Sequence, residues 1–274
     1  MDDLTRSDGA APPIPPLMPG APPIAILVDY DGTIAQTDVS DTIMAEHVPG
    51  AWEAEVAAYD AGQLGSRRLI ELEMSLVNVP LETVLATAAA QPHDPGFVPF
   101  VRLAQAAGIP VEIVSDGFGF FIGPALEALG VGELPVISAR TTFDGRRASV
   151  AFPNGNPACF VCGTCKRDRV LAHQAAERAV VFIGDGESDR YAAGYSDVVW
   201  AKRSLVRICV EAGWPFRRWT EFREIEEWLA ETLRAWATDP TSLPGPGRHP
   251  FFCGPEVWGE GLWDPPPGSW PPAR

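Results

Sequence analysis

The segment Ile24-Ala25-Ile26-Leu27-Val28-Asp29-Tyr30-Asp31-Gly32-Thr33 joins five apolar residues directly to two aspartates and a glycine. A short, continuous apolar run that ends in turn-forming residues is typical of a strand buried in a parallel sheet. Two further runs, 111–114 and 180–183, have the same form, and they are followed by Ser115 and by Gly184-Asp185. Because ligands of parallel sheets bind beyond the carboxyl ends of the strands, we expect these polar residues to converge.

The stretches between these runs predict helices at residues 99–107, 120–129 and 166–178. Strands that alternate with helices are typical of an α/β protein. We therefore predict a Rossmann-like parallel sheet covered by helices, with a core domain made of residues 24–38 and 93–236.

Residues 39–92 interrupt this alternation, because three consecutive stretches within them favour helix. These stretches are residues 51–61, 66–77 and 81–90. We predict that they form a small helical cap inserted after the first strand. Residues 141–152 carry a central Asp-Gly between strand-forming residues, which predicts a hairpin.

Both ends of the chain are rich in proline. Residues 1–23 are predicted to be a disordered arm, because proline removes backbone donors and favours an extended, solvated chain. Residues 237–274 combine proline with tryptophan and phenylalanine, which predicts a C-terminal tail that packs on the body or on a partner.

The composition limits the possible partners. A formal net charge of -15 disfavours nucleic acid, which is bound through clustered lysine and arginine. No apolar run approaches the ~20 residues that cross a bilayer, and no basic segment followed by an apolar one opens the chain. We expect a cytoplasmic protein with no membrane partner. The sequence leaves the oligomeric state open, a homodimer included.

Four aspartates follow the predicted strands. Asp29 and Asp31 are two residues apart, so that one can attack a substrate while the other handles a proton. Asp185 and Asp189 follow a later strand that should end nearby. Four acids gathered together repel one another unless a cation intervenes, and hard oxygen ligands suit Mg²⁺. Taken separately, the two pairs also fit a turn after a strand and a helix N-cap.

Together these residues resemble the four motifs of haloacid dehalogenase superfamily phosphatases. In order, the motifs fall on Asp29-Tyr30-Asp31-Gly32-Thr33, Ser115, Lys166, and Gly184-Asp185-Gly186-Glu187-Ser188-Asp189. The inserted cap resembles that of the branch that contains phosphoserine phosphatases. Within this branch the chain is most similar to the methionine-salvage 2-hydroxy-3-keto-5-methylthiopentenyl-1-phosphate phosphatases, which also have a cysteine-rich stretch leading into the lysine.

The resemblance implies a Mg²⁺-dependent phosphatase that acts on a small phosphorylated metabolite. Asp29 would be the nucleophile that forms an aspartyl-phosphate, and Asp31 the general acid and base. The resemblance further implies that Mg²⁺ is held by Asp29, the main-chain carbonyl of Asp31 and Asp185, and that Asp189 orients the lysine or a metal-bound water. Phosphate would be bound by Ser115, by the amide of Asp116 or Gly117, and by Lys166.

The substrate stays open at this point. Asp38 lies nine residues after Asp29, where these enzymes often carry an acid that faces the substrate. Arg67 and Arg68 lie in the predicted cap and could meet an anionic group of the substrate, or could simply be solvated. Asp116 departs from the glycine common at this place in several relatives. Phosphates of serine, choline or ethanolamine are therefore alternatives to the enol phosphate.

Three of the five cysteines lie in the pattern Cys159-x-x-Cys162-x-x-Cys165, directly before the lysine. They could bind Zn²⁺, which normally takes four ligands in a structural site. The fourth would then be His173, Cys209 or Cys253. Reduced thiols without a metal are the alternative reading.

Two non-enzymatic functions compete with the phosphatase. Receiver-type regulators also combine an acidic pocket, a phosphorylatable aspartate, a hydroxyl residue and a lysine. They have neither a cap nor a proton donor at the position of Asp31. A binding protein that retains the fold without catalysis is the second alternative, although every expected catalytic position is occupied.

Overall fold

The computed structural model describes residues 9–48, 50, 52–61, 63–243 and 253. In this part of the chain, six parallel strands form one sheet in the order β3-β2-β1-β6-β7-β8. The strands are β1 (Ile24–Val28), β2 (Val111–Val114), β3 (Val136–Ile137), β6 (Ala179–Gly184), β7 (Val198–Ala201) and β8 (Arg217–Arg218).

Strand β1 lies in the middle of the sheet, and its composition explains why. All five of its residues are buried, since the sheet is covered on both faces. Ile26 and Val28 belong to the larger of two hydrophobic clusters, whereas Leu27 belongs to the other, as the alternation of side chains along a strand requires. Ile26 pairs with Val111 of β2 on one side and with Val181 of β6 on the other.

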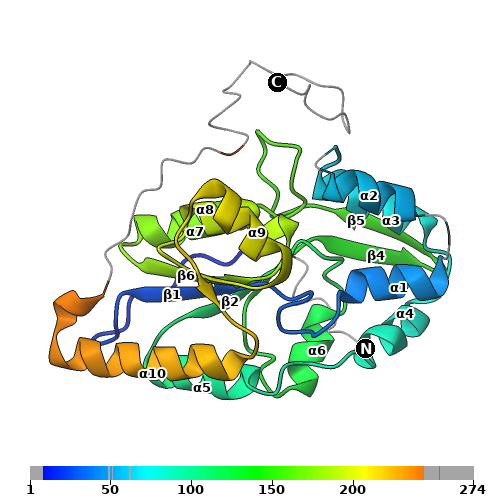
Figure 1. The fold of residues 1–274 in the computed structure, drawn as a ribbon. Coiled ribbons are helices and arrows are strands. Elements are labelled where there is room, and N and C mark those ends of the chain that lie inside the picture. Colours follow the sequence, from blue (N-terminus) through cyan, green and yellow to red (C-terminus); the bar gives the residue numbers. More distant parts are fainter. Residues whose placement is uncertain (1–8, 49, 51, 62, 244–252, 254–274) are drawn as a thin grey trace.

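Helices cover both faces of the sheet (Figure 1). One layer holds α7 (Lys166–Ala175), α8 (Arg190–Tyr195) and α9 (Arg203–Ala212), and the opposite layer holds α5 (Phe97–Ala106), α6 (Ile122–Ala128) and α10 (Phe222–Thr238). The rings of Phe97 and Phe222 meet edge to face, with centroids 5.2 Å apart, and join α5 to α10. The predicted Rossmann-like α/β fold is thus confirmed.

The cap stands at one end of the sheet (Figure 1). Its helices are α1 (Val39–His47), α2 (Glu53–Asp60), α3 (Ser66–Leu76) and α4 (Leu81–Ala89). The hairpin of β4 (Arg140–Asp144) and β5 (Arg147–Ala151) packs against α3, and a guanidinium nitrogen of Arg146 donates to the carbonyl of Asn78 at 2.7 Å. The insertion and the hairpin, which are far apart in sequence, therefore form one structural unit.

The described part of the N-terminal arm, residues 9–23, is placed on the body. Arg169 donates to the carbonyl of Pro12 at 2.7 Å, and Arg178 donates to the carbonyl of Pro15. Both arginines are buried and need acceptors, and a proline segment supplies carbonyls without competing backbone donors. The expected disorder of residues 1–23 therefore differs from the structure over residues 9–23, and residues 1–8 lie outside the described residues.

Little of the predicted C-terminal tail can be assessed. Helix α10 continues to Thr238, a short 3₁₀ helix spans Pro240–Ser242, and Cys253 is buried against the body. The tryptophans of the tail lie outside the described residues. Among the described residues, none of the helices combines the length and the apolar character that a membrane span requires.

Candidate active site

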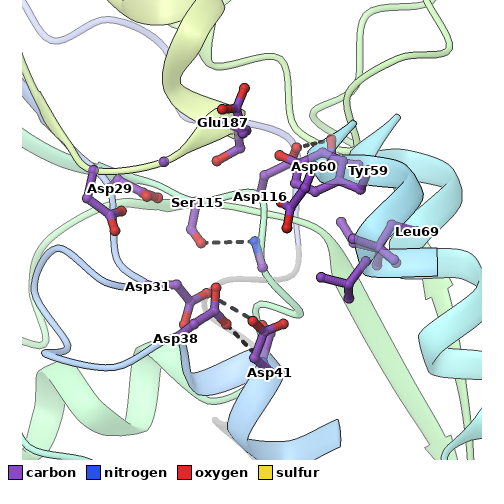
Figure 2. A pocket seen from close by; sticks show the side chains of 18 of the residues that line it. Asp29, Asp31, Asp38, Asp41, Tyr59, Asp60, Leu69, Ser115, Asp116 and Glu187 are labelled. Atoms are coloured by element: carbon purple, nitrogen blue, oxygen red, sulfur yellow. Dashed lines mark hydrogen bonds between the residues drawn. The ribbon is translucent and has the colours of Figure 1, made fainter. Parts of the chain in front are cut away.

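A cavity of about 320 Å³ lies between the carboxyl ends of the central strands and the cap. Asp29 follows β1, Ser115 follows β2 and Asp185 follows β6, and all three line this cavity. Figure 2 shows Asp29, Asp31 and Ser115 on its core side, and Tyr59, Asp60 and Leu69 reaching in from α2 and α3. The structure therefore brings together the residues that the sequence placed at strand ends.

Lys166, the first residue of α7, links two of the aspartates. Its ammonium group donates to Oδ1 of Asp29 at 2.6 Å and to Oδ1 of Asp189 at 2.7 Å. The side chain is only 2% exposed. Burial alone would lower the pKa of Lys166, but the charges of Asp189 and Asp29 outweigh burial and raise it. The lysine is thus a fixed positive charge beside the expected nucleophile.

Asp29, Asp185 and Asp189 form a buried carboxylate cluster, with one oxygen of each within 4.8 Å of the others. Burial and the charge of Asp189 raise the pKa of Asp29 well above its usual range, and the same two causes raise the pKa of Asp185 to about 6. Three buried carboxylates beside one lysine leave an excess of negative charge. Their hard oxygen donors fit a Mg²⁺ ion.

The three acids of this cluster differ in their remaining contacts. Oδ2 of Asp189 accepts from the backbone N–H groups of Asp185 and Gly186 at 2.8 and 3.0 Å, so Asp189 shapes the loop as well as orienting the lysine. Asp185 is contacted by Arg203 at 3.1 Å and by the hydroxyl of Thr33 at 3.2 Å. Asp29 and Asp185 are therefore the better placed of the three to face a cation.

A glycine permits this close approach. Gly32 has a φ of 65°, and a Cβ there would lie 2.2 Å from Oδ2 of Asp185. A residue with a side chain would both strain the backbone and displace the carboxylate.

Asp31 points away from the carboxylate cluster. Its Oδ1 accepts from the backbone N–H of Val39 at 3.0 Å, at the start of α1, and its Oδ2 is 3.5 Å from the hydroxyl of Ser40. Burial, followed by the charges of Asp38 and Asp29, raises the pKa of Asp31 well above its usual range. The raised pKa favours the protonated form, which is the form that a general acid needs. A metal contact from Asp31 would have to come from its carbonyl, as the resemblance implies.

The loop after β2 offers hydrogen-bond donors to a phosphate. The hydroxyl oxygen of Ser115 accepts from the N–H of Gly117 at 3.0 Å, which leaves the hydroxyl proton available to a ligand (Figure 2). The side chain of Asp116 makes contacts of its own, separate from the backbone amide that is expected to bind phosphate. It accepts from the hydroxyl of Ser66, at the start of α3, and from the N–H of Thr164 at 2.6 Å. Asp116 therefore ties the loop to the cap and to the cysteine segment, which accounts for its departure from glycine.

The predicted substrate residues of the cap divide into two groups. Asp38 lines the cavity and caps α1 by accepting from the N–H of Asp41 at 2.9 Å. Arg67 and Arg68 are not among the residues that line the cavity. The guanidinium of Arg67 lies 4.9 Å from the ring centre of Phe152, and that of Arg68 pairs with Glu71 at 3.2 Å. Aromatic and acidic neighbours thus hold both guanidinium groups outside the lining, and their contact with an anionic substrate stays a prediction.

Sequence reasoning missed several acids that line the cavity, above all Glu73 on α3. Its signal was present in the sequence, because Glu73 follows Leu69 and Ile70 at helical spacing and so lies on their buried face. The other missed residues are Asp41, Tyr59, Asp60, Glu187 and Arg203. Glu187 lies within the fourth motif but was given no role, and Arg203 follows β7, a strand that was not predicted. Asp41, Tyr59 and Asp60 lie on cap helices and carry no motif, so their place in the lining depends on the tertiary arrangement.

The three clustered cysteines line a small second cavity beside Lys166, together with Cys253. Of the candidates for a fourth zinc ligand, His173 lies 3.2 Å from Glu112, and Cys209 packs in the cluster beneath α9. Among the described residues, no three cysteine sulfurs lie within 4.8 Å of one another. Burial raises the pKa of the Cys159, Cys162 and Cys165 thiols. This geometry does not support a preformed zinc site.

A lysine held between strand-end aspartates, on a parallel sheet with an inserted cap, defines a class of aspartate-based hydrolases. The sequence profile described as haloacid dehalogenase-like hydrolase matches residues 26–194. The chain therefore belongs to this family, and the predicted superfamily is confirmed.

Two named bacterial enzymes are similar to this chain in sequence. The chain is 27% identical over 219 residues to the 2-hydroxy-3-keto-5-methylthiopentenyl-1-phosphate phosphatase of Bacillus velezensis, covering 77% of this chain and 92% of that protein. It is 30% identical over 224 residues to the bifunctional enzyme MtnB/MtnX of Bacillus licheniformis, covering 78% of this chain. The match spans about half the length of that relative, 51%.

Solved structures with the same fold include phosphoserine phosphatases. A phospho-aspartyl intermediate analogue of phosphoserine phosphatase superposes with a TM-score of 0.60 at 17% identity, over 76% of this chain and 99% of that one. A substrate-bound phosphoserine phosphatase complex gives a TM-score of 0.59 at 18% identity, over 76% and 98%. At these identities the likeness concerns the fold. Together, the family and the named relatives support the prediction of a phosphatase.

Proposed function

We propose that this protein is a Mg²⁺-dependent phosphomonoesterase that cleaves a small phosphorylated metabolite through an aspartyl-phosphate on Asp29. One observation carries the proposal: Asp29, which accepts from Lys166 at 2.6 Å, and Asp31, which accepts from the N–H of Val39 at 3.0 Å, line the same cavity with different partners. The carboxylate of Asp29 lies beside a positive charge and can attack. The carboxyl group of Asp31 lies away from that charge and can deliver a proton.

In the first step an oxygen of Asp29 attacks phosphorus, the bond from phosphorus to the alcohol oxygen breaks, and Asp31 gives its proton to the departing alkoxide. In the second step Asp31, now ionised, takes a proton from water, whose oxygen attacks phosphorus and frees Asp29 and inorganic phosphate. Lys166 and the Ser115 hydroxyl would face the phosphoryl oxygens. When bound, Mg²⁺ would be held by Asp29, the Asp31 carbonyl and Asp185, and would neutralise phosphoryl charge.

The test is phosphate release by the purified full chain from a panel of phosphate monoesters. The panel includes the methylthiopentenyl enol phosphate, because relatives carry that name, and phosphates of serine, ethanolamine and choline. We expect release with Mg²⁺, loss after EDTA and recovery when Mg²⁺ is returned. Full activity after exhaustive chelation would refute the metal requirement.

A receiver-like phosphoacceptor regulator is the alternative. It predicts a stable phosphoaspartate after incubation with a small phosphodonor and no turnover of esters. The presence of the cap, whose helices α1, α2 and α3 line one end of the cavity, favours the enzyme, because a lid that closes over a reaction site excludes water from it.

A further inference from the structure

The cavity has two chemically different ends. At the core end Ser115 lines the cavity, and Lys166, outside the lining itself, donates to Asp29 there, so this end suits a phosphate. The cap end is formed by α1, α2 and α3, and Figure 2 shows Asp41, Tyr59 and Asp60 there, facing the core residues across the cavity. Whatever alcohol the phosphate is attached to would occupy this second end.

The charge of the cap end is negative. Among the described residues that line the cavity, Arg203 is the one with a cationic side chain. Its two guanidinium nitrogens are engaged on the core side, with Asp185 at 3.1 Å and with the carbonyl of Gln36 at 2.6 Å. It therefore does not offset the acids of the cap.

Glu73 supplies an independent sign of a missing partner. The residue is 3% exposed and lines the cavity, and its Oε1 has no hydrogen-bond partner among the described residues. A buried acceptor without a donor is unfavourable, and such groups are normally satisfied in folded proteins. Burial and the charges of Asp41 and Asp38 also raise the pKa of Glu73 to about 9. A bound primary ammonium group would supply both the missing donor and a positive charge, and a quaternary ammonium would supply the charge alone.

We propose that Glu73, Asp41 and Asp60 form a cation subsite, and that the substrate is the phosphate ester of a short amino alcohol with a positively charged nitrogen. This inference rests on the proposed phosphatase function. A phosphate dianion that enters an acidic cavity is repelled, and a positive charge on its own leaving group offsets that repulsion. Val56, Leu69 and Ile70 line the same end and suit the carbon atoms around the nitrogen.

The positions of the cap arginines argue against an amino-acid substrate. A carboxylate in this end of the cavity would face acids, since Arg67 and Arg68 lie outside the cavity lining and interact with Phe152 and Glu71. Serine phosphate is therefore expected to be a poor substrate, in spite of the shared fold.

The test compares esters that match in shape and differ in charge. Choline phosphate is paired with 3,3-dimethylbutyl phosphate, and ethanolamine phosphate with propyl phosphate. We expect kcat/KM to favour the cationic member of each pair by about tenfold or more. The preference should be larger for ethanolamine phosphate, whose ammonium can donate a hydrogen bond, than for choline phosphate, which supplies charge alone. Glu73→Gln should reduce that preference towards one, because kcat/KM falls more for the cationic ester than for its neutral partner. Glu71→Gln, on the same helix but outside the cavity lining, is the matched control and should keep the preference.

The remaining outcomes distinguish failure of the cation subsite from failure of the proposed phosphatase activity. Equal rates within the pairs, or a preference for the neutral ester, the enol phosphate or serine phosphate, would overturn the cation subsite while leaving the phosphatase intact. If no ester is cleaved, calorimetric binding of the same pairs separates the two ideas. Tighter binding of the cationic esters that is lost in Glu73→Gln would support the subsite and refute the proposed activity. Equal binding of both members of each pair would refute both.

Discussion

Asp29 and Asp31 are two residues apart and have opposite surroundings. Asp29 receives a hydrogen bond from the ammonium of Lys166, whereas Asp31 lies at the start of α1 against a backbone N–H. The same residue type thus acquires two chemical characters from its neighbours, which is the arrangement that acid–base chemistry with a nucleophile requires.

Asp29→Asn should abolish phosphate release, because an amide cannot serve as the attacking carboxylate. The fold should survive, since the amide oxygen can still accept from Lys166 and the variant buries one charge fewer. We expect a loss of at least about a thousandfold in kcat with an unchanged circular dichroism spectrum. Near-normal turnover of an activated aryl phosphate by this variant would show that another residue attacks.

Asp31→Asn should affect substrates unequally. An alkyl phosphate needs a proton on its leaving oxygen, whereas a nitrophenyl phosphate releases a stable anion without one. Formation of the phosphoenzyme, followed in single-turnover experiments, should therefore slow far more with the alkyl ester. Equal slowing with both esters would argue for a structural role at the start of α1.

Glu73→Gln should stabilise the ligand-free protein as the pH rises. The pKa of Glu73 is raised from 4.5 to about 9 on folding, so the folded state binds the proton more tightly. Stability from this group is present below pH 4.5 and is lost as the pH rises towards 9. The melting temperature of the variant should match that of the wild type near pH 4.5 and exceed it increasingly up to pH 9. A constant difference across this range would show that Glu73 does not titrate as inferred.

At this scale, sequence reasoning found the residues whose position is tied to strand ends. Asp29, Ser115 and Asp185 could be placed because a parallel sheet delivers its strand ends to one edge. The contacts of Arg67, Asp116 and Glu73 could not be predicted in this way. Their partners come from segments that only the tertiary fold brings near.

At the scale of elements, α3 joins the cap to the rest of the molecule. Its first residue, Ser66, donates to Asp116 in the loop after β2, and Arg67 stacks on Phe152 and Phe160, after the hairpin. The next turn carries Leu69, Ile70 and Glu73 into the cavity. One helix therefore contacts the phosphate loop, the hairpin region and the expected leaving-group end.

Arg67→Ala and Arg68→Ala form a matched pair on this helix. Loss of the Arg67 guanidinium should lower the free energy of unfolding by about 0.5–1 kcal/mol or more, because a cation–π contact contributes about this much at an exposed or partly buried site. Arg68 pairs only with Glu71 at the surface and should be nearly neutral. KM should change little in either variant. A selective rise in KM for anionic substrates would restore the original expectation that these arginines bind substrate.

Element prediction succeeded where local patterns were strong. The predicted helices at 66–77 and 81–90 agree closely with α3 and α4, and the hairpin at 141–152 with β4 and β5. Helix α1 was not predicted, because its N-cap Asp38 also fits a loop. Strand β7 and helices α9 and α10 were not assigned from the sequence. The strands β3 and β8 have two residues each and are too short to show a hydrophobic periodicity in the sequence.

At the scale of the whole molecule, the N-terminal arm contributes to the body. Deletion of residues 1–20 removes the carbonyl acceptors of two buried arginines, Arg169 and Arg178. Hydrogen bonds to charged groups contribute about 1.5–3 kcal/mol each, so the melting temperature should fall by roughly 5 °C or more. Deletion of residues 1–8 is the control and should have little effect. An unchanged melting temperature after the longer deletion would show that the arm contributes nothing to stability.

The central position of β1 has a consequence for biosynthesis. Its partner β6 begins about 150 residues later in the chain, so the ribosome must finish most of the protein before Ile24 to Val28 can pair on both sides. At ordinary rates of translation this interval is roughly 8–30 s. Throughout it, the nascent chain exposes an uninterrupted apolar segment. The prolines before that segment and the aspartates after it are the flanking residue types that discourage aggregation. The same aspartates that we assign to catalysis would thus also protect the newborn chain.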